Sequence, residues 1–88
     1  MTKADDRKLD MLARAIAIVA EVHGQRRDDN GDPRILRTLR AMMMADGEEA
    51  QTVLVLREVL ASSRDWTPER LKAEGFPAAV LAKVGSER

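Results

Sequence analysis

The sequence predicts an all-α protein built as a compact bundle of about five helices, and three observations support this class. Apolar residues recur at steps of three and four positions over residues 4–22 and again over residues 33–45. The long apolar run at residues 48–61 contains neither glycine nor proline, and its length favours a helix over a strand. Two further segments carry signals that start or stop helices, and no segment is expected to form a strand.

The first predicted helix covers residues 4–22 and ends near His23. Its apolar side chains repeat with the period of one helix face, while the charged side chains lie largely elsewhere. The apolar set is Leu9, Leu12, Ala13, Ile16, Val19 and Ala20. Residues 25–33 are rich in turn formers and in charges of both signs, so we expect a surface loop with a tight turn at Asn30 and Gly31.

The second predicted helix runs from Pro33 to about Ala45, because proline suits the first helical position. We expect one broad apolar face made of Ile35, Leu36, Leu39, Met42 and Met43. A stripe of arginines recurs at every third position, at Arg34, Arg37 and Arg40. Three consecutive methionines at residues 42–44 point in three directions on a helix, so we expect most of them in the core rather than on a partner-binding surface.

The third predicted helix covers residues 48–61 and follows a cap at Asp46 or Gly47. Glu48 and Glu49 occupy its first turn, where the helix dipole favours acidic side chains. Its apolar residues are Ala50, Val53, Leu54, Val55, Leu56, Val59 and Leu60. Because so few positions are polar, we expect this helix at the centre of the bundle with neighbours on at least two sides.

Two short helices complete the predicted bundle. Thr67 can cap a fourth helix from Pro68 to Glu74, and Gly75 ends it. The fifth helix is expected to start at Pro77. Its apolar residues are Val80, Leu81 and Val84.

Length and composition indicate a single domain, residues 1–88. Fifteen basic and fifteen acidic residues give a formal net charge of zero. A neutral chain lacks the long-range attraction used by DNA-binding proteins and polybasic membrane proteins, so neither partner is expected. No cysteine is present, which excludes disulfides and thiolate metal sites. With no signal peptide or membrane span in the sequence, we expect a cytoplasmic protein.

The charged residues near the first loop offer only weak candidate sites. His23 is the only histidine, which excludes a metal site built from several histidines, and we expect it to hydrogen-bond locally at the helix end. Arg26 and Arg27 could clamp a phosphate, although Asp28 and Asp29 follow them at once. The acidic cluster lacks the distal glutamate of a calcium loop, so a solvated turn is expected. No serine–histidine–aspartate triad or glycine-rich phosphate loop is visible.

Several motifs follow one another in a fixed order between residues 13 and 84. They are EVHGQ, a spaced Asp28, Gly31 and Pro33, the helix RILRTLRAMMM, and VLVLREVLASSRDWTPERLKAEGFP. Together they resemble the HD-domain hydrolases of the RelA/SpoT type. In that family a His-x-Gly-Gln motif precedes a helix, a second helix carries a His-Asp pair, and a Gly-Phe-Pro corner follows. The chain therefore resembles the N-terminal half of an HD domain.

The resemblance implies that the family's metal site has been lost. In the family, a histidine and a later His-Asp pair bind a divalent metal, usually manganese, which activates water for attack on guanosine tetraphosphate or a related ester. The matching positions here are Arg37 and the pair Arg57 and Glu58, while Ala61 and Ser62 replace an acidic pair. A guanidinium group has no lone pair to donate, so we expect no metal and no catalytic residue.

Two interpretations of this former metal site remain open. Glu58 could face Arg37 from the neighbouring helix and form an ion pair in the space of the metal, with Arg57 joining it or pointing to solvent. Alternatively, both arginines are surface residues whose stems lie on apolar neighbours.

The expected function is that of a non-catalytic, HD-like helical protein without a cofactor, acting through protein interaction or self-association. The family's domain continues through further helices, so we expect an apolar face that a homodimer or a protein partner covers. One alternative is a metal-dependent guanosine tetraphosphate pyrophosphohydrolase. Another is a nucleotide- or phosphate-sensing module with guanine nucleotide as ligand. Its candidate binding residues are His23, Arg26, Arg27, Arg34 and Arg37.

Overall fold

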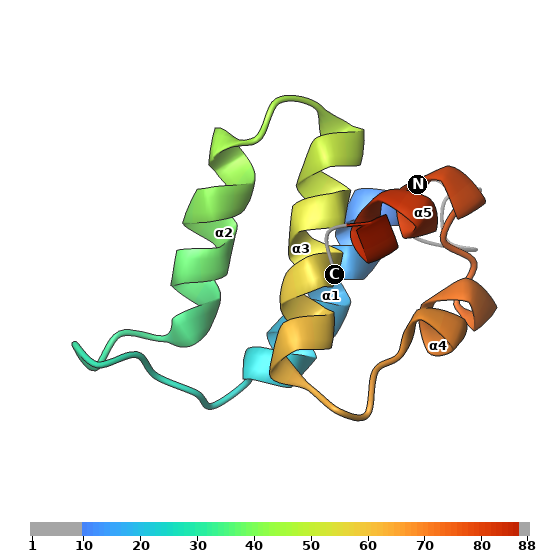
Figure 1. The fold of residues 1–88 in the computed structure, drawn as a ribbon. Coiled ribbons are helices and arrows are strands. Elements are labelled where there is room, and N and C mark those ends of the chain that lie inside the picture. The colour runs from blue at the N-terminus through green and yellow to red at the C-terminus, as the bar shows by residue number, and fades with distance from the viewer. Residues whose placement is uncertain (1–9, 87–88) are drawn as a thin grey trace, which may run out of the picture.

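The computed structural model describes residues 10–86, which form five helices around one hydrophobic core (Figure 1). The helices are α1 (Met11–His23), α2 (Arg34–Met44), α3 (Glu48–Ser62), α4 (Pro68–Ala73) and α5 (Ala78–Ser86). The predicted all-α class is confirmed, and no strand occurs among the described residues. None of the described helices is both long and apolar enough to cross a membrane.

Helix α3 lies at the centre and packs against α1, α2 and α5, as its apolar density predicts (Figure 1). Its buried side chains are Thr52, Val53, Val55, Leu56 and Val59. The hydroxyl of Thr52 donates to the backbone oxygen of Glu48 at 2.8 Å, so this buried polar group is satisfied. Gly47 is the N-cap with a φ of 99°, a backbone conformation that favours glycine.

Helix α1 begins at Met11, because Asp10 before it has an extended backbone. Asp10 belongs to the helix predicted over residues 4–22, so that prediction is wrong at Asp10, while residues 4–9, with the predicted apolar Leu9, lie outside the described residues. The helix ends at His23, which confirms the predicted end near this position. The backbone N–H of Gly24 then donates to the backbone oxygen of Glu21.

The buried face of α1 agrees only in part with the predicted one, since Val19 is buried and Leu12 and Ile16 pack against the core. Ala15, Ile18 and Val19 are buried, whereas Ala13 and Ala20 are exposed. The helix is apolar around most of its circumference, so periodicity alone does not select a face. Turning Ile18 inward removes more apolar surface from water than turning an alanine inward, which favours the observed face.

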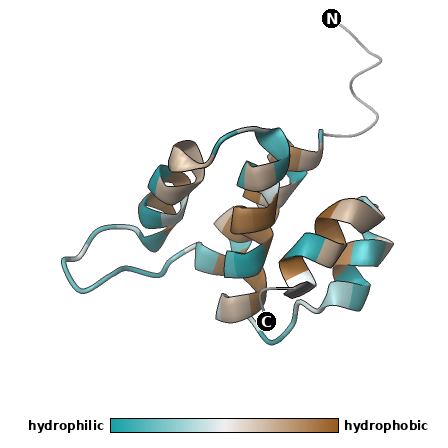
Figure 2. Cartoon of the chain, turned by 45° about the horizontal axis from the view of Figure 1, so that its top comes forward, coloured by the Kyte–Doolittle hydropathy of each residue, from teal (hydrophilic) through white to brown (hydrophobic). Residues whose placement is uncertain are grey.

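The loop between α1 and α2 is organised by one aspartate. The Oδ1 atom of Asp28 accepts hydrogen bonds from the backbone N–H groups of Asn30 and Asp32, at 2.9 and 3.1 Å. Gly31 donates its N–H to the backbone oxygen of Asp28 and has a φ of 86°, which confirms the tight turn predicted here. Figure 2 shows this loop as hydrophilic along its length.

Helix α2 packs mainly on α3, so much of its surface is uncovered (Figure 1). Thr38 and Met42 are its buried residues. Met43 is 73% exposed, Met44 is 85% exposed and Leu36 is 39% exposed. The prediction that most of the methionine run is core is therefore wrong, because no neighbouring helix covers the side of α2 that carries Met43 and Met44.

The helix signals after residue 65 are confirmed with small changes of boundary. The Thr67 hydroxyl accepts the N–H of Arg70 at 3.1 Å, and Pro68 is the first residue of α4. Gly75 has a φ of 99° and follows the end of α4, where a left-handed residue commonly ends a helix. The buried residues of this half are Trp66, Leu71, Phe76, Val80 and Val84.

Candidate functional site

A hydrogen-bonded cluster joins the C-terminal ends of α1 and α3. His23 Nε2 lies 3.0 Å from Glu58 Oε2, and Ser62 Oγ donates to the same oxygen at 2.9 Å. His23 is 1% exposed, and its Nδ1 has no hydrogen-bond partner within residues 10–86. The prediction of a local hydrogen bond for the His23 ring is wrong, since its partner lies on another helix. The cluster fixes the Glu58 carboxylate in one orientation.

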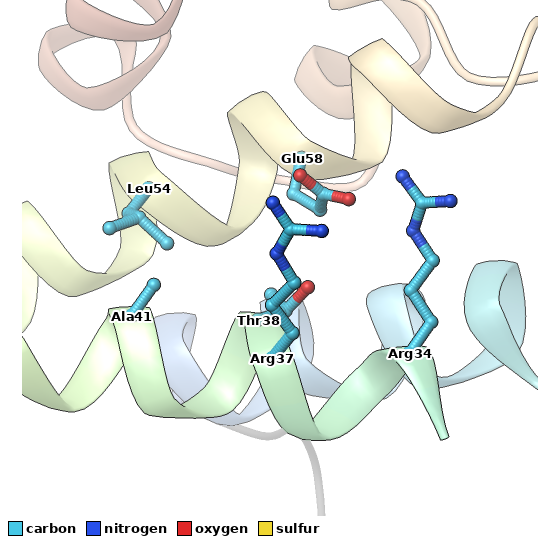
Figure 3. Close-up of a pocket in the computed structure, with 6 residues that line it drawn as sticks. All are labelled: Arg34, Arg37, Thr38, Ala41, Leu54 and Glu58. Atoms are coloured by element: carbon cyan, nitrogen blue, oxygen red, sulfur yellow. The ribbon is translucent and has the colours of Figure 1, made fainter. Parts of the chain in front are cut away.

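A pocket opens between α2 and α3, beside this cluster, with a cavity of about 140 Å³. The residues around it are Arg34, Arg37, Thr38, Ala41, Leu54 and Glu58. Figure 3 shows both arginine side chains rising from α2 toward α3, with the Glu58 carboxylate on the opposite wall. The pocket therefore combines two positive groups, one negative group and a small apolar end.

The ion pair between Arg37 and Glu58, the first of the two interpretations, is not formed within the described residues. Both side chains border the same pocket, but the Glu58 carboxylate pairs with His23 instead. A histidine buried against α3 lies closer to this carboxylate than a flexible, exposed arginine on a helix that is covered on one side only. Arg37 and Glu58 nevertheless face one another across the pocket between α2 and α3.

Arg57 does not belong to this pocket. Its Nη2 donates to the backbone oxygen of Lys83 at 3.0 Å, so its side chain crosses from α3 toward α5. Arg57 and Glu58 are neighbours in sequence, but consecutive helix residues point in directions about 100° apart. Of the three positions that the sequence resemblance assigns to former metal ligands, the structure brings only Arg37 and Glu58 together.

Arg26 and Arg27 both donate to backbone oxygens of the protein, Arg26 to the end of α3 and Arg27 within its own loop. Arg26 Nη1 donates to the backbone oxygen of Ser62 at 3.0 Å, and Arg27 Nη1 donates to that of Gly31 at 2.9 Å. Arg26 also lines a separate, shallow depression that includes Trp66. The five candidate residues for nucleotide binding are thus not gathered in one site, and only Arg34 and Arg37 share a pocket.

Sequence reasoning missed Thr38 and Ser62. Thr38 lies four residues after Arg34 and next to Arg37, so the spacing of the arginines was a signal that its hydroxyl shares their side of the helix. The third predicted helix stops at residue 61, whereas Ser62 is the last residue of α3 and stands four residues after Glu58.

Within residues 10–86, no group of three or more histidine, cysteine, aspartate and glutamate side chains is arranged to hold a metal ion. Comparisons with protein-family models, with curated proteins and with solved structures found no match for this chain.

Proposed function

We propose that this chain is a non-catalytic, HD-like helical protein of the cytoplasm that acts by self-association through α2. One observation carries the proposal. The large apolar side chains that are exposed in the described chain, Leu36, Met43 and Met44, all belong to this single helix. Single apolar residues scattered over a surface are ordinary, but Leu36 and Met43 share one flank of α2 and form an apolar face suited to docking, while Met44 points about 100° away from Met43.

The spacing of these residues fits a second copy of the chain as the occupant. Leu36 and Met43 are seven residues apart, close to two helical turns, so they lie on the same flank of α2. An antiparallel pair of α2 helices, related by a two-fold axis near Leu39 and Arg40, brings Leu36 of one copy against Met43 of the other. The formal net charge of zero adds no long-range repulsion between copies.

The non-catalytic part of the proposal rests on donor chemistry. At positions that match the family's metal ligands, Arg37 and Arg57 carry guanidinium groups that repel a cation and donate no electron pair to it. The one carboxylate in the set, Glu58, has its Oε2 engaged by His23 and Ser62. The HD-like part of the proposal rests on the order and spacing of the sequence motifs.

Light scattering of the purified chain tests self-association. We expect a mass about twice the 9.8 kDa of one chain, and a monomer for the double variant Leu36→Glu with Met43→Glu, because two carboxylates are costly to bury at an apolar contact. Ala79→Glu with Ala82→Glu, at exposed positions of α5, is the matched control and should leave the mass unchanged. A wild-type monomer at every concentration contradicts self-association.

The enzyme alternative has a separate test. Incubation with guanosine tetraphosphate and manganese should release no pyrophosphate if the chain is non-catalytic. Manganese-dependent release that grows with protein concentration would show instead that the assignment of Arg37, Arg57 and Glu58 to the metal positions is mistaken.

A further inference from the structure

Two arginine side chains in the first turn of α2 point into one pocket without a protein partner. Arg34 and Arg37 both line the cavity between α2 and α3, and neither side chain forms an ion pair or hydrogen bond within residues 10–86 (Figure 3). Arg40 and Arg64 likewise have no side-chain partner within residues 10–86, but neither lines this cavity, and five other arginines are anchored. Those that donate to a protein acceptor are Arg14, Arg26, Arg27, Arg57 and Arg70. The unmatched guanidinium donors of Arg34 and Arg37 face space that a small ligand can occupy.

Thr38 adds a hydroxyl without a protein partner to the same pocket. Thr38 is 5% exposed, lines the cavity, and makes no side-chain hydrogen bond within the described part of the chain. Figure 3 shows its oxygen between the side chains of Arg34 and Arg37. The Thr38 oxygen is not one of the buried side-chain atoms that lack a partner, so it is open to the cavity, where a ligand can hydrogen-bond with it.

The position of the two arginines in the helix favours a negative ligand. The first turn of α2 contains no acidic residue, although the positive end of a helix dipole favours negative charge. Two guanidinium groups at this end repel both one another and the dipole. An anion held between them reverses both effects and completes the donors of Arg34, Arg37 and Thr38.

Glu58 restricts which anion fits. Its carboxylate forms the opposite wall of the pocket, and its Oε2 is held by His23 and Ser62. A fully ionised anion such as sulfate brings only acceptor oxygens and is repelled by this carboxylate. An oxyanion that still carries a proton can donate a hydrogen bond through its O–H to the second oxygen of Glu58, while its other oxygens accept hydrogen bonds from the arginines.

We propose that the pocket between α2 and α3 binds a protonated phosphate group, with Arg34, Arg37 and Thr38 as donors and Glu58 as acceptor. The ligand is either inorganic phosphate or a phosphomonoester. The site is independent of the proposed self-association, because the helical repeat places Leu36 and Met43 on the other flank of α2 from Arg34 and Ala41.

Isothermal titration calorimetry near neutral pH, at fixed ionic strength, tests the site with inorganic phosphate, glycerol phosphate and sulfate. We expect saturable binding of inorganic phosphate in the millimolar range or tighter, and weaker binding of sulfate. Glycerol phosphate binding equally well indicates a phosphomonoester site, while its exclusion indicates a site for free phosphate. No saturable phosphate binding, or sulfate binding as tight as phosphate, overturns the proposal.

Variants separate the pocket from general charge effects. Arg34→Ala with Arg37→Ala should weaken phosphate binding by about tenfold or more, because two charge-assisted donors are lost. Arg40→Ala removes the same charge from α2 outside the pocket and should change the affinity little. Glu58→Gln should remove the preference for phosphate over sulfate. If that variant fails to fold, Thr38→Val provides the second test, with an expected several-fold loss.

The control against self-association is the monomeric variant Leu36→Glu with Met43→Glu, which should bind phosphate as the wild type does. Equal losses in the Arg40→Ala and the double-arginine variants would show attraction to net charge alone and contradict a built site.

Discussion

The buried imidazole of His23 ties α1 to α3 and sets where the Glu58 carboxylate lies. The sequence identifies this residue as the only histidine and excludes a cluster of histidine ligands, but it does not reveal the partner. The partner depends on the register between two helices that are separated by α2 and its loop. That register is decided by side-chain packing in the core rather than by local propensity. Contacts between residues on different helices therefore cannot be predicted from the sequence pattern.

Replacing the two partners of Glu58 should have unequal effects on stability. His23→Ala leaves a cavity and a carboxylate with one partner fewer, so we expect the free energy of unfolding to fall by about 2–4 kcal/mol. Ser62→Ala removes one hydrogen bond at a half-buried position and should cost about 0.5–1.5 kcal/mol. Urea denaturation followed by circular dichroism measures both. Equal losses in the two variants would mean that the buried ring is not the main contributor.

Helix boundaries are the part of the fold that the sequence predicts best. Thr67, Pro68 and Gly75 act at the positions where their chemistry requires them, because caps and left-handed residues work within a few residues of chain. Helix faces are predicted less well. Along α1 almost every side is apolar, and along α2 the coverage of Met43 and Met44 depends on helices that a local pattern cannot position.

Two glycines allow a matched test of the boundary signals. Gly75 has a φ of 99°, which strains a residue with a side chain, so Gly75→Ala should lower the free energy of unfolding by about 1–2 kcal/mol. Gly85 lies within α5 with open space around it, so Gly85→Ala should be neutral or stabilise by about 0.5 kcal/mol. Thermal unfolding of the two variants should shift in different directions or at least by clearly different amounts.

At the scale of the whole molecule, the central place of α3 follows from its apolar density, and the structure confirms it. No periodicity or cap signal predicts the pocket between α2 and α3, and only the family resemblance places Arg37 opposite Glu58. Arg34 and Arg37 reach from α2 toward Glu58 on α3. The opposite flank of α2 has no neighbour among the described helices and exposes Leu36 and Met43, on which the proposed self-association depends.

A single engineered thiol tests that association most directly. The chain contains no cysteine, so Arg40→Cys introduces one thiol close to the proposed two-fold axis. Two such thiols can approach within the Cα separation of about 4–7 Å that a disulfide needs. Mild oxidation should convert Arg40→Cys rapidly to a covalent dimer on a non-reducing gel, and should convert Glu69→Cys, on the exposed surface of α4, only slowly. Equal rates for the two variants would contradict an α2 interface.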